Sequence, residues 1–110
     1  MTVKDMAQSL SLAKLAGEEN NDVVTGCYIG DLLSWVMGRA GEGNAWITVM
    51  GNINAVAVAK LAELSCIILC EDAHLDEDAR IQADSNGIAI YASGETAYAL
   101  AVKIAALLAG

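Results

Sequence analysis

The chain is 110 residues long, which suits one domain with a single hydrophobic core, and we predict that residues 1–110 form one such unit. Its formal net charge of −8 would repel nucleic-acid phosphates and anionic membrane surfaces, so neither is expected as a partner. The three cysteines form no CxxC pair, which is typical of a reducing compartment, and we expect a cytoplasmic location.

Hydrophobic residues make up 55% of the chain, more than soluble domains usually carry. Asp5 interrupts the N-terminal stretch where a secretory signal needs an unbroken apolar run. The longest apolar run, Ala97–Ala109, contains Lys103 and is shorter than the ~20 residues that a membrane-spanning helix requires. Because a helix that is apolar on nearly all sides must be covered on both, we predict a homo-oligomer, with a dimer favoured.

The N-terminal third predicts two short helices and one strand. Thr2 can cap a first helix that ends near Leu10. Val23–Ile29 is apolar enough for a strand. Asp31 can cap a second helix that runs to Met37, where the glycines that follow are expected to end it.

From residue 45 onwards, short apolar runs about 21 residues apart alternate with helical stretches. The runs are AWITV, CIILC and IAIY, and the helices are expected at Ile53–Leu64, Glu77–Asn86 and Glu95–Leu108, with N-caps at Asn52, Asp76 and Ser93 and a stop at Gly87. Apolar strands joined by helices favour a parallel sheet that is covered on both faces. The predicted fold class is therefore α/β, a three-layer sandwich with a small, mostly parallel sheet flanked by helices.

Polar residues follow these strands at the edge where folds of this class usually bind ligands. The candidate ligand-binding residues are Thr48, Asn52, Asn54, Ser93, Glu95 and Thr96. The same residue types cap helices and form turns, so a purely structural interpretation stays open. The loops carry no Lys or Arg and no glycine-rich phosphate motif, which disfavours nucleotide hydrolysis and kinase chemistry and leaves the identity of any cofactor unknown.

The cysteines and the single histidine are weak candidates for chemistry. On one strand, Cys66 and Cys70 would lie roughly 13 Å apart, too far to pair or to share a metal. Cys70 and His74 offer two ligands where a structural zinc site needs four, so no metal site is predicted. Cys27 could be a reactive thiol if it is exposed, although a buried, inert cysteine is commoner.

Two further features have a structural interpretation. The acidic residues at 71–78 lack the spacing of an EF-hand and are expected to be solvated residues at a helix start. Trp35 and Trp46 flank a glycine-containing turn and are expected to anchor packing rather than to stack on a cofactor.

The stretch VTGCYIGDLLS at 24–34, continued by WVMGRAGEGNAWITV and GNINAVAVAKLAELSCIILC, resembles the DRTGG domain family over nearly the whole chain. Thr25 and Gly26 match the naming motif, but Val23 and Val24 replace its Asp and Arg, and Cys27 replaces its second Gly. The residues of the motif region are Thr25, Gly26, Cys27, Gly30 and Asp31.

This resemblance implies a small α/β domain similar to the N-terminal domain of bacterial HPr kinase/phosphorylase and to modules attached to phosphotransacetylases and CBS-domain proteins. That N-terminal domain lacks a P-loop, so kinase activity is not implied. The resemblance also implies a stand-alone subgroup that is often encoded beside iron-only hydrogenase and other redox genes in anaerobic bacteria.

We therefore predict a non-catalytic regulatory module that senses a small ligand or binds a protein partner. The alternative is a small enzyme or thiol-dependent redox protein that uses Cys27 or the strand-end pocket, with Asp31 as an acid or base. A third hypothesis is an adaptor that docks on a larger redox or signalling protein.

Overall fold

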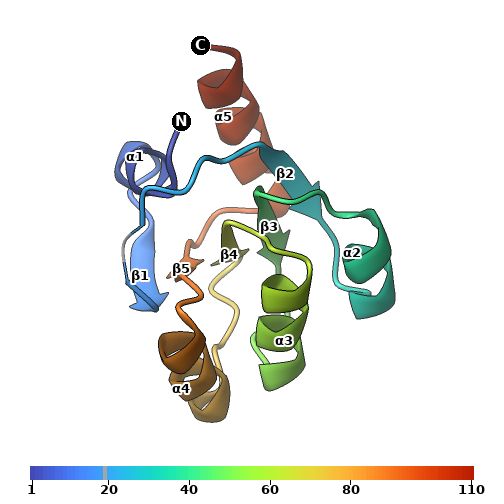
Figure 1. The fold of residues 1–110 in the computed structure, drawn as a ribbon. Coiled ribbons are helices and arrows are strands. Elements are labelled where there is room, and N and C mark those ends of the chain that lie inside the picture. Colours follow the sequence, from blue (N-terminus) through green and yellow to red (C-terminus); the bar gives the residue numbers. More distant parts are fainter. Residues whose placement is uncertain (19) are drawn as a thin grey trace.

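A computed structural model describes residues 1–18 and 20–110, and a five-stranded sheet forms its middle layer (Figure 1). The elements in chain order are α1 Val3–Ser9, β1 Ala13–Ala16, β2 Gly26–Ile29, α2 Leu33–Arg39, β3 Asn44–Thr48, α3 Ile53–Leu61, β4 Cys66–Leu69, α4 Glu77–Asn86, β5 Ile90–Ala92 and α5 Ala97–Ala109. The predicted strands and helices after residue 45 are all present.

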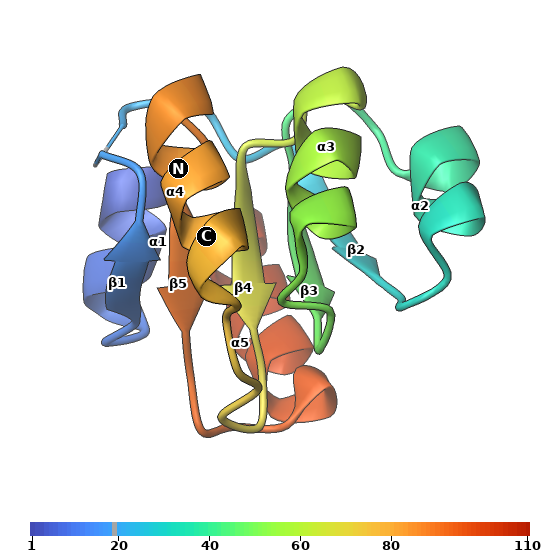
Figure 2. The ribbon, with the colours of Figure 1, turned by 90° about the horizontal axis from the view of Figure 1, so that it is seen from below.

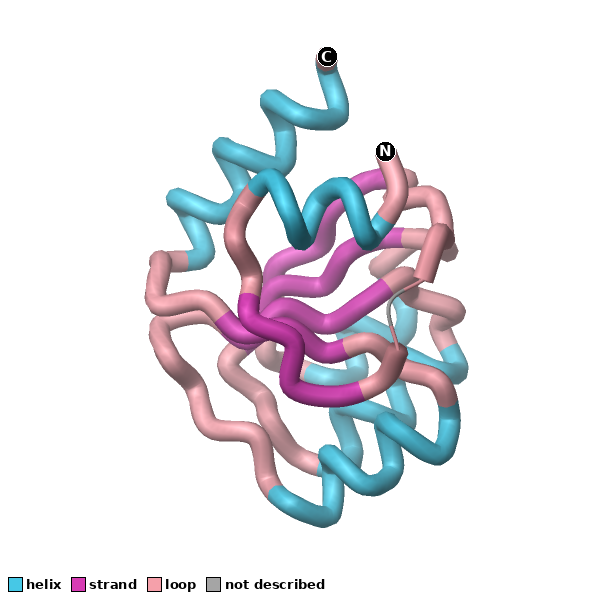
Figure 3. The backbone as a smooth tube through the Cα atoms, turned by 90° about the vertical axis from the view of Figure 1, so that its left-hand side faces the viewer, coloured by secondary structure: helices cyan, strands magenta, loops and turns pink. Residues whose placement is uncertain are grey.

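The strand order is β1-β5-β4-β3-β2, with β2 to β5 parallel and β1 antiparallel to β5. Each crossover from β2 to β5 moves one strand in the same direction, and right-handed crossovers then place their helices on one face. Figures 2 and 3 show α2, α3 and α4 on that face and α1 and α5 on the other. The predicted three-layer sandwich with a mostly parallel sheet is confirmed.

Two hydrophobic cores result because both faces of the sheet are covered. Trp46 of β3 points into the layer of α2, α3 and α4, where it packs with Val36 and Val56. Its neighbour Ile47 points into the opposite layer, where Leu100 of α5 is fully buried. Strands buried on both faces need apolar side chains at every position, which explains why they read as unbroken apolar runs.

Strand β1 was not predicted. Its sequence, AKLA, has no β-branched or aromatic residue and is four residues long, so it carries little strand signal. It forms because the free edge of β5 accepts it, with Ala13 opposite Ala92 and an irregularity between Lys14 and Ala16. The antiparallel strand makes the sheet mixed at this edge.

The predicted caps are partly right. Thr2 and Asn52 cap α1 and α3 through their side-chain oxygens, as expected. The predicted cap at Ser93 is wrong, because α5 begins later and Thr96 caps it. Asp31 is also not a cap, since α2 begins at Leu33 and the Asp31 carboxylate is held by β3 instead.

The ends of three helices also bear on the predictions. Gly87 ends α4 in the left-handed region at φ 68°, as predicted. The α3 helix stops at Leu61, before the predicted end, and Glu63 takes a φ of 56°. The α2 helix passes through Gly38 to Arg39. No helix in the described ranges is both long and apolar enough to cross a membrane.

Candidate functional site

Four loops leave the carboxyl ends of the parallel strands along one edge of the sheet, which we call the carboxyl edge. They are residues 30–32, 49–52, 70–76 and 93–96, after β2, β3, β4 and β5 respectively. Figure 2 shows the four arrowheads pointing toward the same side. The six candidate ligand-binding residues lie in or beside these loops: Thr48, Asn52, Asn54, Ser93, Glu95 and Thr96.

Most of these polar groups are already used by helix caps and turns. The Asn52 side chain accepts a hydrogen bond from the backbone N–H of Ala55 at 2.9 Å. The Ser93 hydroxyl accepts one from the backbone of Glu95 at 3.1 Å, and the Glu95 carboxylate pairs with Lys103. Asn54 is exposed on the first turn of α3. A ligand-binding role for the six residues remains a prediction.

One polar cluster at this edge joins Asp31 to Thr48. Asp31 Oδ1 accepts hydrogen bonds from Thr48 Oγ1 at 2.7 Å and from the Val49 backbone at 3.0 Å. Thr48 is buried, and its hydroxyl also accepts a bond from the Met50 backbone at 3.1 Å. Trp46 Nε1 donates to the Gly30 carbonyl at 2.8 Å, so two groups of β3 fix the turn after β2.

The loops after β4 and β5 are tied to each other through the backbone. Glu71 donates to the Glu95 carbonyl at 2.9 Å, and Asp72 donates to the Ser93 carbonyl at 3.1 Å. Glu71 and Asp72 both have positive φ, 55° and 57°, which is unusual for consecutive non-glycine residues. With Asp31 in the first loop of the same edge, the carboxyl edge is rich in carboxylates and suits neutral or cationic groups better than phosphates.

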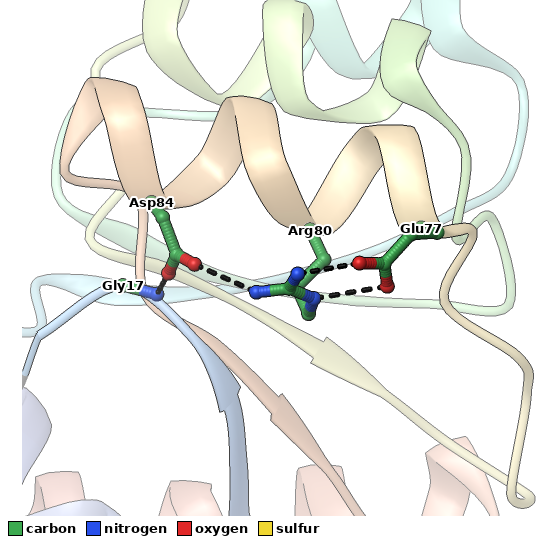
Figure 4. Close-up of polar contacts among 4 residues, drawn as sticks. All are labelled: Gly17, Glu77, Arg80 and Asp84. Carbon is green, nitrogen blue, oxygen red and sulfur yellow. Dashed lines mark hydrogen bonds and ion pairs between the residues drawn. The ribbon is translucent and has the colours of Figure 1, made fainter.

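A cavity of about 360 Å³ lies between loop 70–76 and β1, and Arg80 is the one cation that lines it among the described residues. Figure 4 shows that the guanidinium of Arg80 binds the carboxylate of Glu77 through two nitrogens and Asp84 through a third. These hydrogen bonds lower the pKa of Glu77. Asp84 also accepts a bond from Gly17 N at 2.7 Å, so the cluster holds α4 against the end of β1 rather than offering a free cation to an anion.

The residues of the DRTGG-like motif do not form one site. Thr25 and Gly26 lie where β2 begins, at the amino edge of the sheet, whereas Gly30 and Asp31 lie beyond its carboxyl end. Thr25 Oγ1 donates to the Glu42 carbonyl at 2.7 Å. A cavity of about 490 Å³ borders Thr25 at this edge, and three carboxylates line it: Asp22, Glu42 and Glu63.

Thr25 holds the turn that precedes β3, and Gly26 leaves room beside it, because a Cβ at Gly26 would lie 3.1 Å from Asn44 Nδ2. Asn44 Nδ2 donates to Thr25 Oγ1 at 3.1 Å, while Asn44 Oδ1 accepts from the Gly41 backbone at 2.9 Å. Gly43 has a φ of 81°, and a Cβ atom there would lie 2.7 Å from Thr25 Cγ2. The Thr-Gly pair of the motif therefore has a packing role that the sequence did not reveal.

Cys27 and Cys66 flank Ala45 on neighbouring strands. The parallel register places Cys27 beside Ala45 and Ala45 beside Cys66. Two strand spacings put the Cys27 and Cys66 Cα atoms about 9.6 Å apart, beyond the ~7 Å limit for a disulfide. Burial raises the pKa of the Cys27 thiol from 9.0 to about 11 and that of Cys66 to about 12. Burial also raises the pKa of Cys70.

These raised pKa values predict slow thiol chemistry in the folded chain. A shift of Cys27 from 9.0 to about 11 lowers its thiolate fraction near pH 8 by about 100-fold. Ellman's reagent should therefore label the native chain far more slowly than the urea-unfolded chain. The free energy of unfolding should also fall as pH rises above 9, because the folded chain then keeps protons on thiols that are ionised in the unfolded chain. Native Cys27 that labels as fast as the unfolded chain would support the thiol-enzyme alternative.

Exposed apolar side chains gather at the open edge of the sheet, around β2 and α2. The members of this group, which we call the β2–α2 rim, are Ile29, Leu32, Trp35, Met37 and Val49. Trp35 is expected to anchor packing, but 51% of it is exposed, and its ring packs only against the Arg39 guanidinium among the ring contacts of the described residues, 3.6 Å from the ring centre. Trp46, by contrast, is fully buried as predicted.

Among the described residues, no group of three or more His, Cys, Asp and Glu side chains is placed to hold a metal ion. His74 lies in an exposed part of loop 70–76, 3.7 Å from the Asp76 carboxylate. It has no nucleophile partner among the contacts of the described residues.

No protein-family model matches the chain, and no curated protein matches it. A crystal structure of the CBS and DRTGG domains of the regulatory region of the Clostridium perfringens pyrophosphatase, complexed with its activator diadenosine tetraphosphate, has a similar fold. The TM-score is 0.73 at 13% identity, over 90% of this chain and 44% of that one. This chain thus spans less than half of the neighbour, and the likeness supports a DRTGG-related fold.

Proposed function

We propose that the chain is a non-catalytic regulatory module that works by binding, and that a second copy of itself is one of its partners. The observation that carries this proposal is the β2–α2 rim, where apolar side chains surround an unpaired sheet edge. An open edge with exposed apolar residues tends to associate unless charges protect it. The apolar excess of the whole sequence supports the same proposal.

The regulatory part of the proposal has separate support. The similar fold occurs in a regulatory region that was crystallised with an activator. A polyphosphate ligand does not suit the carboxylate-rich edge of this chain, so a ligand bound there would be neutral or cationic. The cytoplasmic location and the link to hydrogenase or redox metabolism remain predictions of the sequence and of its family resemblance.

The thiol-enzyme alternative has less support. Its reactive group would be Cys27, whose pKa burial raises to about 11, whereas reactive thiols need a lowered pKa. Its acid or base would be Asp31, which is held by Thr48 and Val49 in a structural role. Both groups are better explained by packing and loop positioning than by turnover.

Sedimentation velocity tests the proposal over a concentration series from micromolar to millimolar. We expect a species of twice the 11.4 kDa chain mass to grow with concentration. Native mass spectrometry of the same samples would report any co-purified small molecule. A chain that stays monomeric across the series and carries no ligand would overturn the proposed function.

A further inference from the structure

The outward surface of α2 has features that fit a second copy of this chain. Leu33 and Val36 turn inward, where Val36 is fully buried against α3 and β3. Leu32 and Trp35 turn outward with 58% and 51% exposed. Gly38 belongs to the same outward side, and a Cβ built there meets no atom within 4 Å, so another backbone can approach closely.

The segment that contains α2 carries no net charge, unlike the chain as a whole. The chain carries a net charge of −8, yet residues 23–41 contain one acidic and one basic residue, Asp31 and Arg39. Two copies that meet here avoid bringing like charges together. Neither residue forms an ion pair within the described part of the chain, since Asp31 accepts from neutral donors and Arg39 stacks on Trp35.

The order of the two charges along α2 sets the pairing. Asp31 precedes the helix and Arg39 ends it, so two antiparallel copies of α2 place each carboxylate opposite the partner's guanidinium. Such pairing is isologous, as in most homodimers. Trp35 lies midway between positions 31 and 39, which puts it at the two-fold axis against its own counterpart.

We infer that the chain forms a two-fold dimer through antiparallel α2 helices, with Trp35 at the axis and reciprocal Asp31–Arg39 pairs on either side. This inference rests on the proposed function and specifies the surface that it uses. The free edge of β2 lies beside this contact.

A competing surface lies on α5. Its outward stripe is apolar and follows helical spacing, with Tyr98, Val102, Ala105 and Ala109 all exposed. This stripe has no charged residue that could orient a partner. The α2 surface is favoured because it combines apolar area with complementary charges, a combination that fixes both register and direction.

Disulfide trapping tests the axis. In an otherwise native chain, Trp35→Cys should give a covalent dimer under mild oxidation, because its two copies meet at the axis and a disulfide traps even short-lived contacts. Val102→Cys is the matched control, since Val102 is 50% exposed on the competing stripe. Two outcomes would overturn the inference. In one, the Val102→Cys chain forms a covalent dimer and the Trp35→Cys chain does not. In the other, neither variant forms a covalent dimer although the wild-type chain is dimeric.

Charge reversal tests the pairing. Arg39→Glu should raise the dimer dissociation constant by at least about tenfold, because it places carboxylates opposite carboxylates. Lys4→Glu makes the same change in net charge on the exposed side of α1 and should have little effect. Equal effects of the two variants would overturn the inference and leave the proposed function standing. A wild-type chain that stays monomeric would remove the inference, and it would remove the proposed function as well if it also carried no ligand.

Discussion

Replacing Gly51 by alanine is expected to lower the free energy of unfolding by about 3 kcal/mol or more, since overpacking against backbone cannot be relieved by a side-chain rotation. A Cβ atom at Gly51 would lie 1.9 Å from the His74 carbonyl oxygen and 3.0 Å from Leu75 Cα. The backbone cannot simply move away, because the Asp76 N–H donates to the Gly51 carbonyl at 2.8 Å. Relief of the clash requires the loops after β3 and β4 to separate.

Urea unfolding followed by circular dichroism measures this change through the shift of the midpoint. Gly38→Ala is the matched control at concentrations where the chain is monomeric, because within one copy a Cβ there meets no atom within 4 Å. In a helix, that replacement should stabilise the chain by ~0.5–1 kcal/mol. If Gly51→Ala costs no more than about 1 kcal/mol, the two loops do not pack as closely as described.

The interior strands could be predicted from the sequence because their burial produces an unbroken run of apolar residues. β3 and β4 are covered on both faces, so nearly every side chain must be apolar, and the runs AWITV and CIILC show this directly. β1 carries no such signature, since it is an edge strand whose pairing depends on the neighbouring β5. Local residue types cannot reveal a strand that is made by its partner.

The caps and the candidate site show a second limit. Ser93 and Thr96 are both good N-cap residues three positions apart, and tertiary packing decides which one begins α5. The Asp31–Thr48 bond joins residues 17 positions apart and follows only from the parallel register of β2 and β3. Residue type thus located the polar groups at the carboxyl edge without revealing which of them were already bonded.

Trp35 shows that an apolar residue need not lie in the core. A tryptophan in a small domain is expected in the core, and Trp46 meets that expectation. α2 lies at the outer flank of its layer (Figure 1), so one side of this helix has no neighbour in the described part of the chain. Hydrophobicity alone cannot tell a core position from an interface position, because both remove the side chain from water.

Leu100→Ala on α5 is expected to lower the free energy of unfolding by about 2–5 kcal/mol, as truncations of fully buried leucines do. Leu100 has no exposed surface and packs among the side chains between α5 and the sheet. Ile104, one turn later, is equally buried and would be left beside the cavity. The same urea titration measures the loss.

Val102→Ala, two residues further along the helix, provides the contrast. Half of Val102 is exposed, so its truncation removes little buried area, and alanine favours the helix slightly more than valine does. The stability of this variant should therefore stay within ~0.5 kcal/mol of the wild type. A different result is expected if a second copy covers α5. Val102→Ala would then lower stability strongly, and the loss would grow with protein concentration, because association buries the otherwise exposed Val102 side chain.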